Sequence, residues 1–426
     1  MSEMDMSYVR TEMLPEQEPP RSQTGAAKWL RENLFSGWIN TILTILSLAF
    51  IALVLHEFLP WIFDSTWNAN SLSECREIAP GACWAVIKER WPQLLYGFYP
   101  EELRWRVNLS FVLMLVAIAP VLFTGVPRKL LWFTAAFPVL GYWLLWGGSL
   151  WGPLMALAGF GVGAGVYAAI RPVNNLAALI AGPLAVVIWW LAAAGPVAGL
   201  LAGGVPLMLE PVPSSKFGGF SLSIIIGVTG IAFSLPLGIL LALGRQSNLF
   251  IVKAICVGFI EFIRGVPLIT LLFVASVLLN YFLPPGTSFD IILRVVIMVT
   301  LFASAYMAEV VRGGLAALPR GQYEAADALG LDYWKAQRLI IMPQALKISI
   351  PNIVSTFIGL FKDTTLVSII GLLDPLGLST AIRADTNWNG IVWELYGFIA
   401  LMFFIFCYSM SRYSQYLERK LQTGHR

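Results

Sequence analysis

The sequence predicts an all-α polytopic membrane protein with about ten transmembrane helices. Three observations support this prediction. Only 12% of the 426 residues are charged, whereas about a quarter of the residues in soluble domains are. Apolar runs recur at close to the roughly 20 residues that a helix needs to cross a bilayer. Several of the 16 tryptophans lie near the ends of these runs, at the depth that Trp favours. A soluble protein is the weaker interpretation.

The N-terminal region predicts a tail, an anchor and a loop, in that order. Residues 1–36 contain three prolines and scattered charges without helical periodicity, which indicates a disordered cytoplasmic tail. The run Trp38–Phe63 is too late and too long for a secretory signal, so it is expected to remain as an anchor. The loop 64–106 then carries Cys75 and Cys83, which form a disulfide only if the loop faces an oxidising compartment. Their spacing leaves both states open.

The remaining runs divide into an N-terminal extension, residues 37–210, and a core, residues 220–416, with five spans each. After the anchor, the extension is expected to span at Leu109–Gly125, Leu130–Gly147, Leu154–Ile170 and Asn175–Ala194. The core is expected to span at Phe220–Gly244, Leu268–Leu283, Ile291–Val311, Pro351–Leu372 and Ile391–Tyr408. Pro196–Leu209 is short and flanked by prolines, which favours an interfacial or re-entrant segment. Residues 211–219 form a periplasmic linker, and 417–426 a cytoplasmic tail.

The basic residues predict the orientation of these spans. With the N-terminus in the cytoplasm, nineteen of the 28 Lys and Arg residues lie in inner segments and eight in outer segments. Lys362 is left within a span. The positive-inside rule therefore places both termini in the cytoplasm.

A glycine-rich stretch in the extension favours packing over ligand binding. Gly159, Gly161, Gly163 and Gly165 make two small-xxx-small patterns, which let helix backbones approach closely in lipid. No Lys-Ser/Thr follows them, so a phosphate-binding loop is not indicated.

The polar stretch 313–347 in the core predicts two short helices with a corner between them. Tyr323–Leu329 is rich in helix formers, and Gly330 is suited to end that helix in a left-handed conformation. Asp332 is placed to cap the second helix. Pro343 is expected to break the helical pattern before the next span.

This stretch resembles the E-A-A-x3-G-x9-I-x-L-P loop of bacterial ABC importer permeases. Glu324-Ala325-Ala326, Gly330, Ile340 and Pro343 match it, and Met342 replaces the usual Leu. The resemblance implies a type I ABC importer permease core in the C-terminal half. It also implies that the loop forms a coupling helix that docks on a separate cytoplasmic ABC ATPase subunit. The residues it assigns to this role are Tyr323, Glu324, Ala325, Ala326, Gly330 and Pro343. The plainer alternative is an ordinary amphipathic hairpin.

Three further stretches resemble the polar amino acid (histidine/glutamine-type) permeases. They are Ile260–Pro267, Ser304–Gly314 and Lys362–Leu366. Within that subfamily the chain is most similar to the larger permease of general L-amino-acid transport systems, and the extension suits that assignment. The resemblance implies a second permease subunit, a periplasmic amino-acid-binding protein and a bacterial inner membrane. It places ATP and Mg in the partner ATPase, with no cofactor on this chain.

Lys362 and Asp363 lie within an otherwise apolar span, where a charge facing lipid costs at least about 2.5 kcal/mol. They are therefore expected to face protein or water. Ser355 belongs to a small-polar stripe on the same helix, which is expected to face the bundle interior. With the hydroxyls of Thr364 and Thr365, the pair suits the ammonium and carboxylate of an amino acid. A structural ion pair between helices is the alternative.

Four more charges predict either an inner gate or an interfacial anchor. Glu309 and Arg312 are three residues apart near the cytoplasmic end of a span, and they are expected to pair locally or with Glu261 and Arg264. The segment Phe250–Arg264 has its polar residues in one arc, so it is equally suited to lie along the membrane surface.

The sequence thus predicts a permease subunit of an ATP-driven importer of L-amino acids. The chain has no Walker A sequence, no Cys/His cluster with metal-ligand spacing and no catalytic triad, so it is expected to be non-catalytic and to bind no metal. No basic cluster predicts nucleic-acid binding. The alternative is an ion-coupled secondary amino-acid transporter, which leaves the E-A-A loop unexplained.

Overall fold

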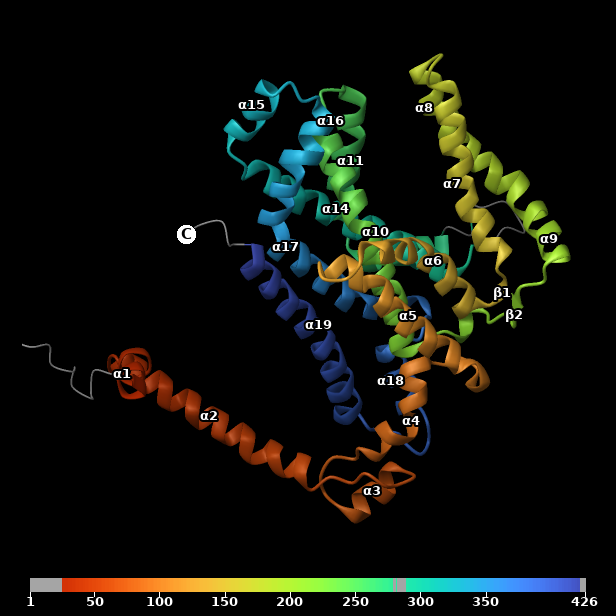
Figure 1. Cartoon of the computed structure of the whole chain (residues 1–426). Helices are drawn as coiled ribbons and strands as arrows, with labels where there is room; N and C mark the ends of the chain where they lie inside the picture. Colours follow the sequence, from red (N-terminus) through yellow and green to blue (C-terminus); the bar gives the residue numbers. More distant parts are fainter. Residues whose placement is uncertain (1–24, 279–280, 282–288, 422–426) are drawn as a thin grey trace, which may run out of the picture. The chain divides into compact units, whose positions relative to one another are not determined.

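The structure, a computed structural model, describes residues 25–278, Tyr281 and residues 289–421 (Figure 1). Most of the predicted N-terminal tail and residues 422–426 lie outside the described residues. The chain forms two compact units, Met1–Ala69 with Ser73–Trp84, and Asn70–Leu72 with Ala85–Arg426.

The first unit contains α1 (Gly25–Asn33), α2 (Trp38–Phe63) and most of α3 (Leu72–Ile78). A disordered tail over all of 1–36 is wrong for Gly25–Asn33, which is helical. Lys28 and Glu32, one turn apart in α1, form an ion pair at 3.8 Å, a spacing that supports a helix. No residue of α2 is buried within the protein, so its 26-residue apolar surface is free to contact lipid.

The second unit begins with the helices of the extension. They are α4 (Ala85–Tyr96), α5 (Arg104–Leu122), α6 (Leu131–Trp146), α7 (Trp151–Ile170), α8 (Asn175–Ile188) and α9 (Ala194–Gly204). Short 3-10 turns at Glu101–Leu103, Arg128–Leu130 and Ser214–Lys216 join them to their neighbours. The strands β1 (Gly148–Ser149) and β2 (Met208–Leu209) pair antiparallel, with Gly148 opposite Leu209.

Pro196–Leu209 was predicted to be an interfacial or re-entrant segment. This prediction is wrong for residues 196–204, which belong to a long helix. The helix that starts at Asn175 continues through a π-helical turn at Trp189–Ala193 and on through α9, for 30 residues in all. A widened turn before Pro196 lets the helix continue past a residue without an N–H group. This span is therefore longer than the predicted Asn175–Ala194.

Only one of the two glycine patterns in α7 packs against a neighbour. Gly159 lies against Trp190, and Gly163 lies against Val186 and the backbone of Gly182. Gly161 and Gly165 face open space. The close helix approach expected in lipid therefore occurs along the Gly159–Gly163 edge alone.

The core half of the second unit contains the remaining helices. They are α10 (Gly219–Arg245), α11 (Phe250–Gly265), α12 (Leu268–Phe273), α14 (Ile291–Ala316), α15 (Arg320–Ala328), α16 (Tyr333–Ala336), α17 (Met342–Asp363), α18 (Pro375–Arg383) and α19 (Trp393–Leu421). A π-helical turn at Val274–Leu278 extends α12, and a second one at Gln337–Ile341 precedes α17. A 3-10 segment at Thr364–Ile370 follows α17.

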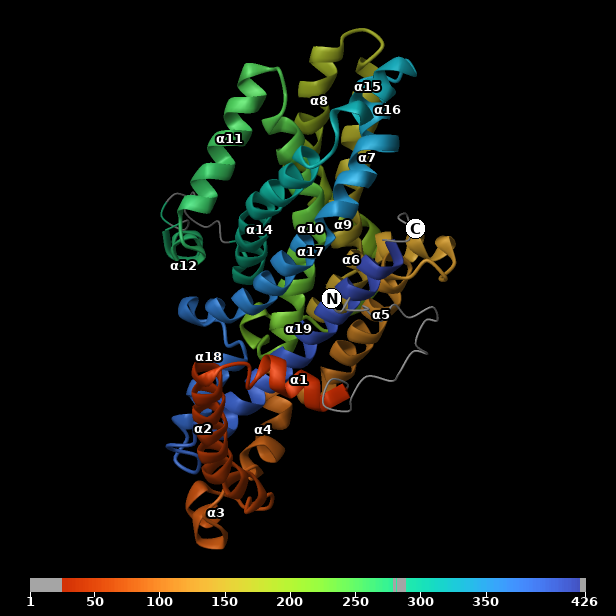
Figure 2. The ribbon, with the colours of Figure 1, turned by 90° about the vertical axis from the view of Figure 1, so that its left-hand side faces the viewer.

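Helices α10, α14 and α17 lie side by side at the centre of this unit (Figure 2). Close approach depends on glycine, because a Cβ atom at Gly238 in α10 would lie 2.6 Å from Met307 Cβ in α14. Gly314 of α14 lies directly against Ser349 and the Ala345 carbonyl of α17. Larger residues at these positions would force the helices apart.

The described residues contain nine helices that are long and apolar enough to cross a membrane. A tenth is obtained if Phe250–Gly265 and Leu268–Leu278, which are bent by 102° relative to each other, make one span together. The prediction of about ten transmembrane helices in an all-α protein is therefore confirmed. Part of the expected span Leu268–Leu283 lies outside the described residues.

The linker between extension and core is well packed and lies inside the second unit. The Arg106 guanidinium donates to the Glu210 carbonyl at 2.6 Å, and the Val212 N–H donates to the Trp146 carbonyl at 2.9 Å. The Trp146 indole donates to Ser214 Oγ at 2.7 Å. Helices α4–α9 and the core thus form one compact unit.

Candidate functional site

The E-A-A residues lie on α15, in a polar knob formed by α15, the turn 329–332 and α16. The knob lies at one end of α14 and α17 (Figures 1 and 2). It follows directly from the end of α14, since α15 starts after the extended residue Pro319. The predicted corner is present, and the first short helix, α15, precedes it, but the second helix does not end before Pro343.

Gly330 gives the knob its corner. Its φ is +67°, a left-handed conformation that residues with a Cβ rarely adopt. Its N–H donates to the Asp327 carbonyl at 2.9 Å, and the Leu331 N–H donates to the Ala326 carbonyl at 3.2 Å. These two bonds form a Schellman motif, which satisfies carbonyls that the end of α15 would leave free.

Asp332 caps α16, as its position predicted. Its carboxylate accepts the Lys335 backbone N–H at 2.9 Å and lies 3.0 Å from the Lys335 ammonium. The backbone hydrogen bond, followed by the side chain of Lys335, lowers the pKa of this exposed carboxyl. Asp332 is therefore ionised at neutral pH and fixes the start of α16.

Pro343 does not break the helix, so that prediction is wrong. Residues Tyr333–Ile370 run as one helix of 38 residues, with the π-helical turn Gln337–Ile341 directly before α17. The wider turn accommodates the missing N–H and the ring of Pro343. The second helix of the knob, α16, is thus continuous with the helix that carries Lys362.

The two faces of α15 have different surroundings. Ala326 is 1% exposed, and Tyr323 packs against the cluster that contains Ile341. Gln322 Oε1 accepts a hydrogen bond at 2.9 Å from Gln344 of α17, which holds α15 on the long helix. The opposite face is free: its exposed residues include Glu324, Ala325, Asp327 and Ala328, followed by Leu329 just after the helix.

The predicted inner-gate charges form one network, and its central residue is one that no sequence motif marks. Arg245, at the end of α10, lies 2.6 Å from Glu309 of α14 and 2.9 Å from Glu261 of α11. Glu309 also binds Arg312 at 2.9 Å, and Arg264 lies 3.9 Å from Glu261. The network therefore joins three helices. Arg245 directly follows the predicted span Phe220–Gly244, and only this location in the sequence could have pointed to it.

The substrate-pathway residues are not brought together in the bundle interior. Lys362 and Ser355 are exposed, Asp363 is half-buried, and Thr364 is fully buried. Thr364 and Thr365 donate their hydroxyls to the carbonyls of Phe361 and Lys362 at 2.7 and 2.9 Å. An interior polar stripe is wrong: α17 buries Ile353, Leu360 and Phe361 instead.

The alternative for Lys362 and Asp363 was a structural ion pair between helices. In the part of the chain that the structure describes, neither residue forms a salt bridge. The two residues are adjacent in α17, so their side chains point about 100° apart around the helix axis. Lys362 therefore faces away from this chain's own core, together with Ser355 and Asn352.

The two loop cysteines are joined in the first unit. Cys75 of α3 and Cys83 form a disulfide with their Cα atoms 5.8 Å apart, and both side chains are buried. Thr66 and Cys83 form a parallel bridge, and the Thr66 N–H donates to the Ala82 carbonyl at 2.8 Å. Among the described residues, no group of three or more His, Cys, Asp or Glu side chains is arranged to hold a metal.

Comparison with known proteins identifies the family. The family model for the inner membrane component of binding-protein-dependent transport systems matches residues 234–423. The chain is 59% identical over 434 residues to BztC of Rhodobacter capsulatus, a glutamate/glutamine/aspartate/asparagine transport system permease protein. That match covers 99% of this chain and 100% of the relative.

Two further relatives show how the chain is built. YhdY of Escherichia coli, an inner membrane amino-acid ABC transporter permease protein, is 43% identical over 95% of this chain and 97% of its own length. GlnM of Bacillus subtilis, a probable glutamine ABC transporter permease protein, is 30% identical and aligns over 93% of its length with 49% of this chain. None of these relatives supports an ion-coupled carrier. The chain therefore belongs to the binding-protein-dependent transport system inner membrane components, as a permease of the polar amino acid ABC importers.

Proposed function

We propose that this permease uses the knob as its coupling element and docks the free face of α15 on a separate cytoplasmic ATPase. The observation that carries the proposal is the two-sided environment of α15. Ala326 and Tyr323 hold the helix on the permease, while Glu324, Ala325 and Ala328 are free to enter a groove on a partner. Small side chains allow close backbone approach. A movement of the ATPase then reaches α17 through α16, which is continuous with it.

A second permease subunit is proposed to cover the exposed polar stripe of α17. Asn352, Ser355 and Lys362 lie within a span and are exposed in the single chain. Leaving such groups in contact with lipid is costly, so they require water or a partner. Two bundles that meet along these stripes would enclose a polar pathway between them, to which a periplasmic amino-acid-binding protein delivers the substrate.

The substrates are proposed to include acidic amino acids and their amides, after which the relative that is 59% identical is named. Lys362 supplies a cation on the pathway side, which suits a substrate carboxylate. Thr365, whose hydroxyl oxygen keeps acceptor capacity, lies beside it.

The proposed function is tested by uptake into vesicles that contain this chain with its permease, ATPase and binding-protein partners. We expect uptake of radiolabelled glutamate when MgATP is supplied on the side of the membrane that carries the ATPase. With ADP on that side we expect no uptake, whether or not an ion gradient is imposed. Uptake that follows the ion gradient and ignores ATP would contradict the proposal.

Replacing Lys362 with methionine should raise the substrate concentration needed for half-maximal uptake by about tenfold, because one charge-assisted contact contributes about 1.5–3 kcal/mol. Lys347→Met is the matched control, since Lys347 is also exposed and lies on the same helix near its other end. Equal half-maximal concentrations in the Lys362→Met variant and wild type would remove Lys362 from the substrate pathway.

The network around Arg245 is proposed to close the end of the pathway next to the knob. It joins α10, α11 and α14 through charge-assisted contacts, and two of these helices, α10 and α14, pack directly against α17. Opening this end separates those helices, so the network stabilises the closed state relative to the open one. Both termini are proposed to lie on this cytoplasmic side of the bacterial inner membrane, where the basic residues are concentrated.

A further inference from the structure

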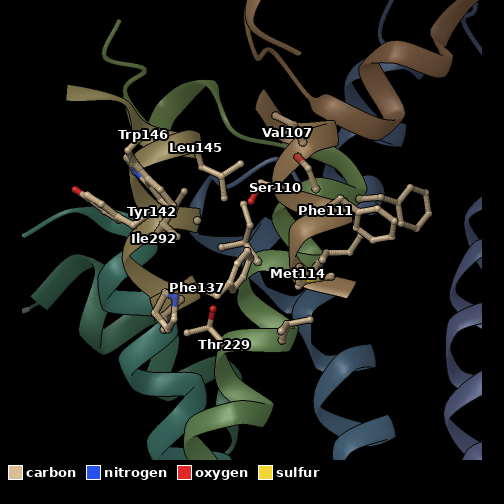
Figure 3. Close-up of a pocket in the computed structure, with 18 of the residues that line it drawn as sticks. Val107, Ser110, Phe111, Met114, Phe137, Tyr142, Leu145, Trp146, Thr229 and Ile292 are labelled. Atoms are coloured by element: carbon tan, nitrogen blue, oxygen red, sulfur yellow. The ribbon is translucent and has the colours of Figure 1, made fainter. Parts of the chain in front are cut away.

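The second unit contains a cavity of about 620 Å³ between the extension and the permease core. Its walls come from α4, α5 and α6 on one side and from α10, α14 and α19 on the other. Figure 3 shows Trp146, Leu145 and Val107 at one end, Ser110 and Phe137 between, and Thr229 at the other end. This volume lies within the range of small-molecule and cofactor sites.

The polarity of the walls changes along the cavity. At the start of α5, α10 and α14 and the end of α6, the lining includes Asn108, Ser221, Asp290 and Trp146. The Tyr96 hydroxyl donates to Asn108 Oδ1 at 2.8 Å at this end.

Further along α5, α6 and α10, and on α19, the lining is apolar apart from Ser110 and Thr229. It consists of side chains such as Met114, Phe137, Ala232, Phe233 and Phe406. The cavity therefore has one polar end and a long apolar interior.

Three lining side chains are also exposed at the surface of the protein: Tyr142 by 48%, Phe233 by 50% and Leu293 by 47%. They lie on α6, α10 and α14, which are all helices that can cross the membrane. The cavity thus opens at the protein surface along helices that can cross the membrane, which gives lipid a route into it from the side.

Arg104 does not line the cavity, but it packs on Tyr96, which lines the polar end. The Arg104 guanidinium lies 5.5 Å from the centre of the Tyr96 ring, and its Nη1 contacts Glu101 at 3.0 Å. The buried Arg104 Nε has no hydrogen-bond partner among the described residues. The Arg104 side chain as a whole is 24% exposed, so its positive charge lies at the surface next to the polar end, where it favours an anionic oxygen such as that of a phosphate.

We propose that this cavity binds a membrane phospholipid, with one acyl chain in the apolar interior and the headgroup phosphate near Arg104. The transported amino acids do not fit it, because their paired charges would be desolvated against apolar walls. An acyl chain instead replaces empty space with van der Waals contact. The lipid joins the extension to the core, which gives the extension a structural role in holding a lipid against α10 and α14.

The test uses the assembled complex in vesicles of phosphatidylethanolamine and phosphatidylglycerol that contain one of two photoreactive phosphatidylethanolamines. The first carries a diazirine at the end of an acyl chain, and the second carries it in the headgroup. After illumination and digestion, we expect the acyl probe to label peptides of Met114, Phe137 and Phe233, and the headgroup probe to label the peptide of Arg104. Excess unlabelled lipid should reduce both signals less than it reduces the labelling of α2.

Matched variants separate a bound lipid from general contact with the bilayer. Met114→Trp fills the cavity and should reduce acyl labelling of Phe137 at least tenfold. Leu115→Trp places the same side chain on the adjacent residue, which is 52% exposed and does not line the cavity, and should leave labelling unchanged. Ala232→Phe fills the cavity from α10 and serves if Met114→Trp does not assemble. Labelling unaffected by both filling variants would overturn the proposal, as would cross-links to a protein partner in place of lipid.

Discussion

Replacing Gly330 with valine is expected to abolish ATP-dependent uptake while leaving the protein inserted in the membrane. Gly330 has a φ of +67°, and a β-branched residue held there is strained by about 1–3 kcal/mol. The strain falls on a Schellman motif that fixes the angle between α15 and α16. Because the free face of α15 must meet the ATPase at that angle, the variant should hydrolyse ATP without transport or lose the ATPase altogether. Uptake and ATPase retention are measured on the same vesicles.

Two controls distinguish the conformational requirement from added bulk. Gly330→Asn places a residue that tolerates the left-handed conformation, and it should keep most of the uptake. Gly313→Val adds the same branched side chain in α14, where there is open space and no positive φ, and it should transport normally. Uptake by Gly330→Val equal to that of wild type would remove the corner from the coupling mechanism.

Replacing Arg245 with glutamine is expected to reduce uptake by about tenfold or more. Arg245 is the only member of its network that contacts acidic residues from two other helices. Its loss leaves Glu309, which is 17% exposed, with one cation in place of two. Removing one side of such a contact costs about 1.5–3 kcal/mol, which shifts a two-state equilibrium ten- to a hundredfold. The closed state should be less populated.

A double-mutant cycle checks that the effect comes from the network. The substitution Glu309→Gln should cost less in the Arg245→Gln background than in the wild type, because the unbalanced carboxylate is then removed. Arg312→Gln removes a cation that is 43% exposed and contacts Glu309 alone, so its effect should be smaller. Additive effects of Arg245→Gln and Glu309→Gln would contradict a shared network.

The sequence was informative wherever local chemistry determines structure. The left-handed Gly330 and the cap by Asp332 follow from backbone sterics and from a side chain that reaches its own helix end, so both could be predicted. The apolar runs predicted most spans for a similar reason, since the bilayer requires length and hydrophobicity of each helix separately.

The predictions that were wrong or incomplete concern features that the local residue pattern does not determine. Pro343 was expected to break a helix and Pro196–Leu209 to be an interfacial or re-entrant segment, yet each of these prolines follows a π-helical turn that no residue pattern marks. The stripe of Ser355 and Lys362 was expected to face inward, because a polar face in a span must avoid lipid. A polar face must indeed avoid lipid, but this requirement does not determine whether the same chain or another subunit covers it. Arg245 was missed because its two acidic partners are 16 and 64 residues away.

The most direct test of the central claim, that this chain is driven by an ATPase through the free face of α15, is site-specific photocross-linking in the assembled complex. A benzophenone amino acid is placed at Ala325, which is exposed on α15, and at Gln415, which is exposed on α19. The account predicts a cross-link from residue 325 to the ATPase subunit whose yield changes when ATP is bound, and none from residue 415. A probe at residue 325 that labels only lipid or water, in a complex that still transports, would contradict it.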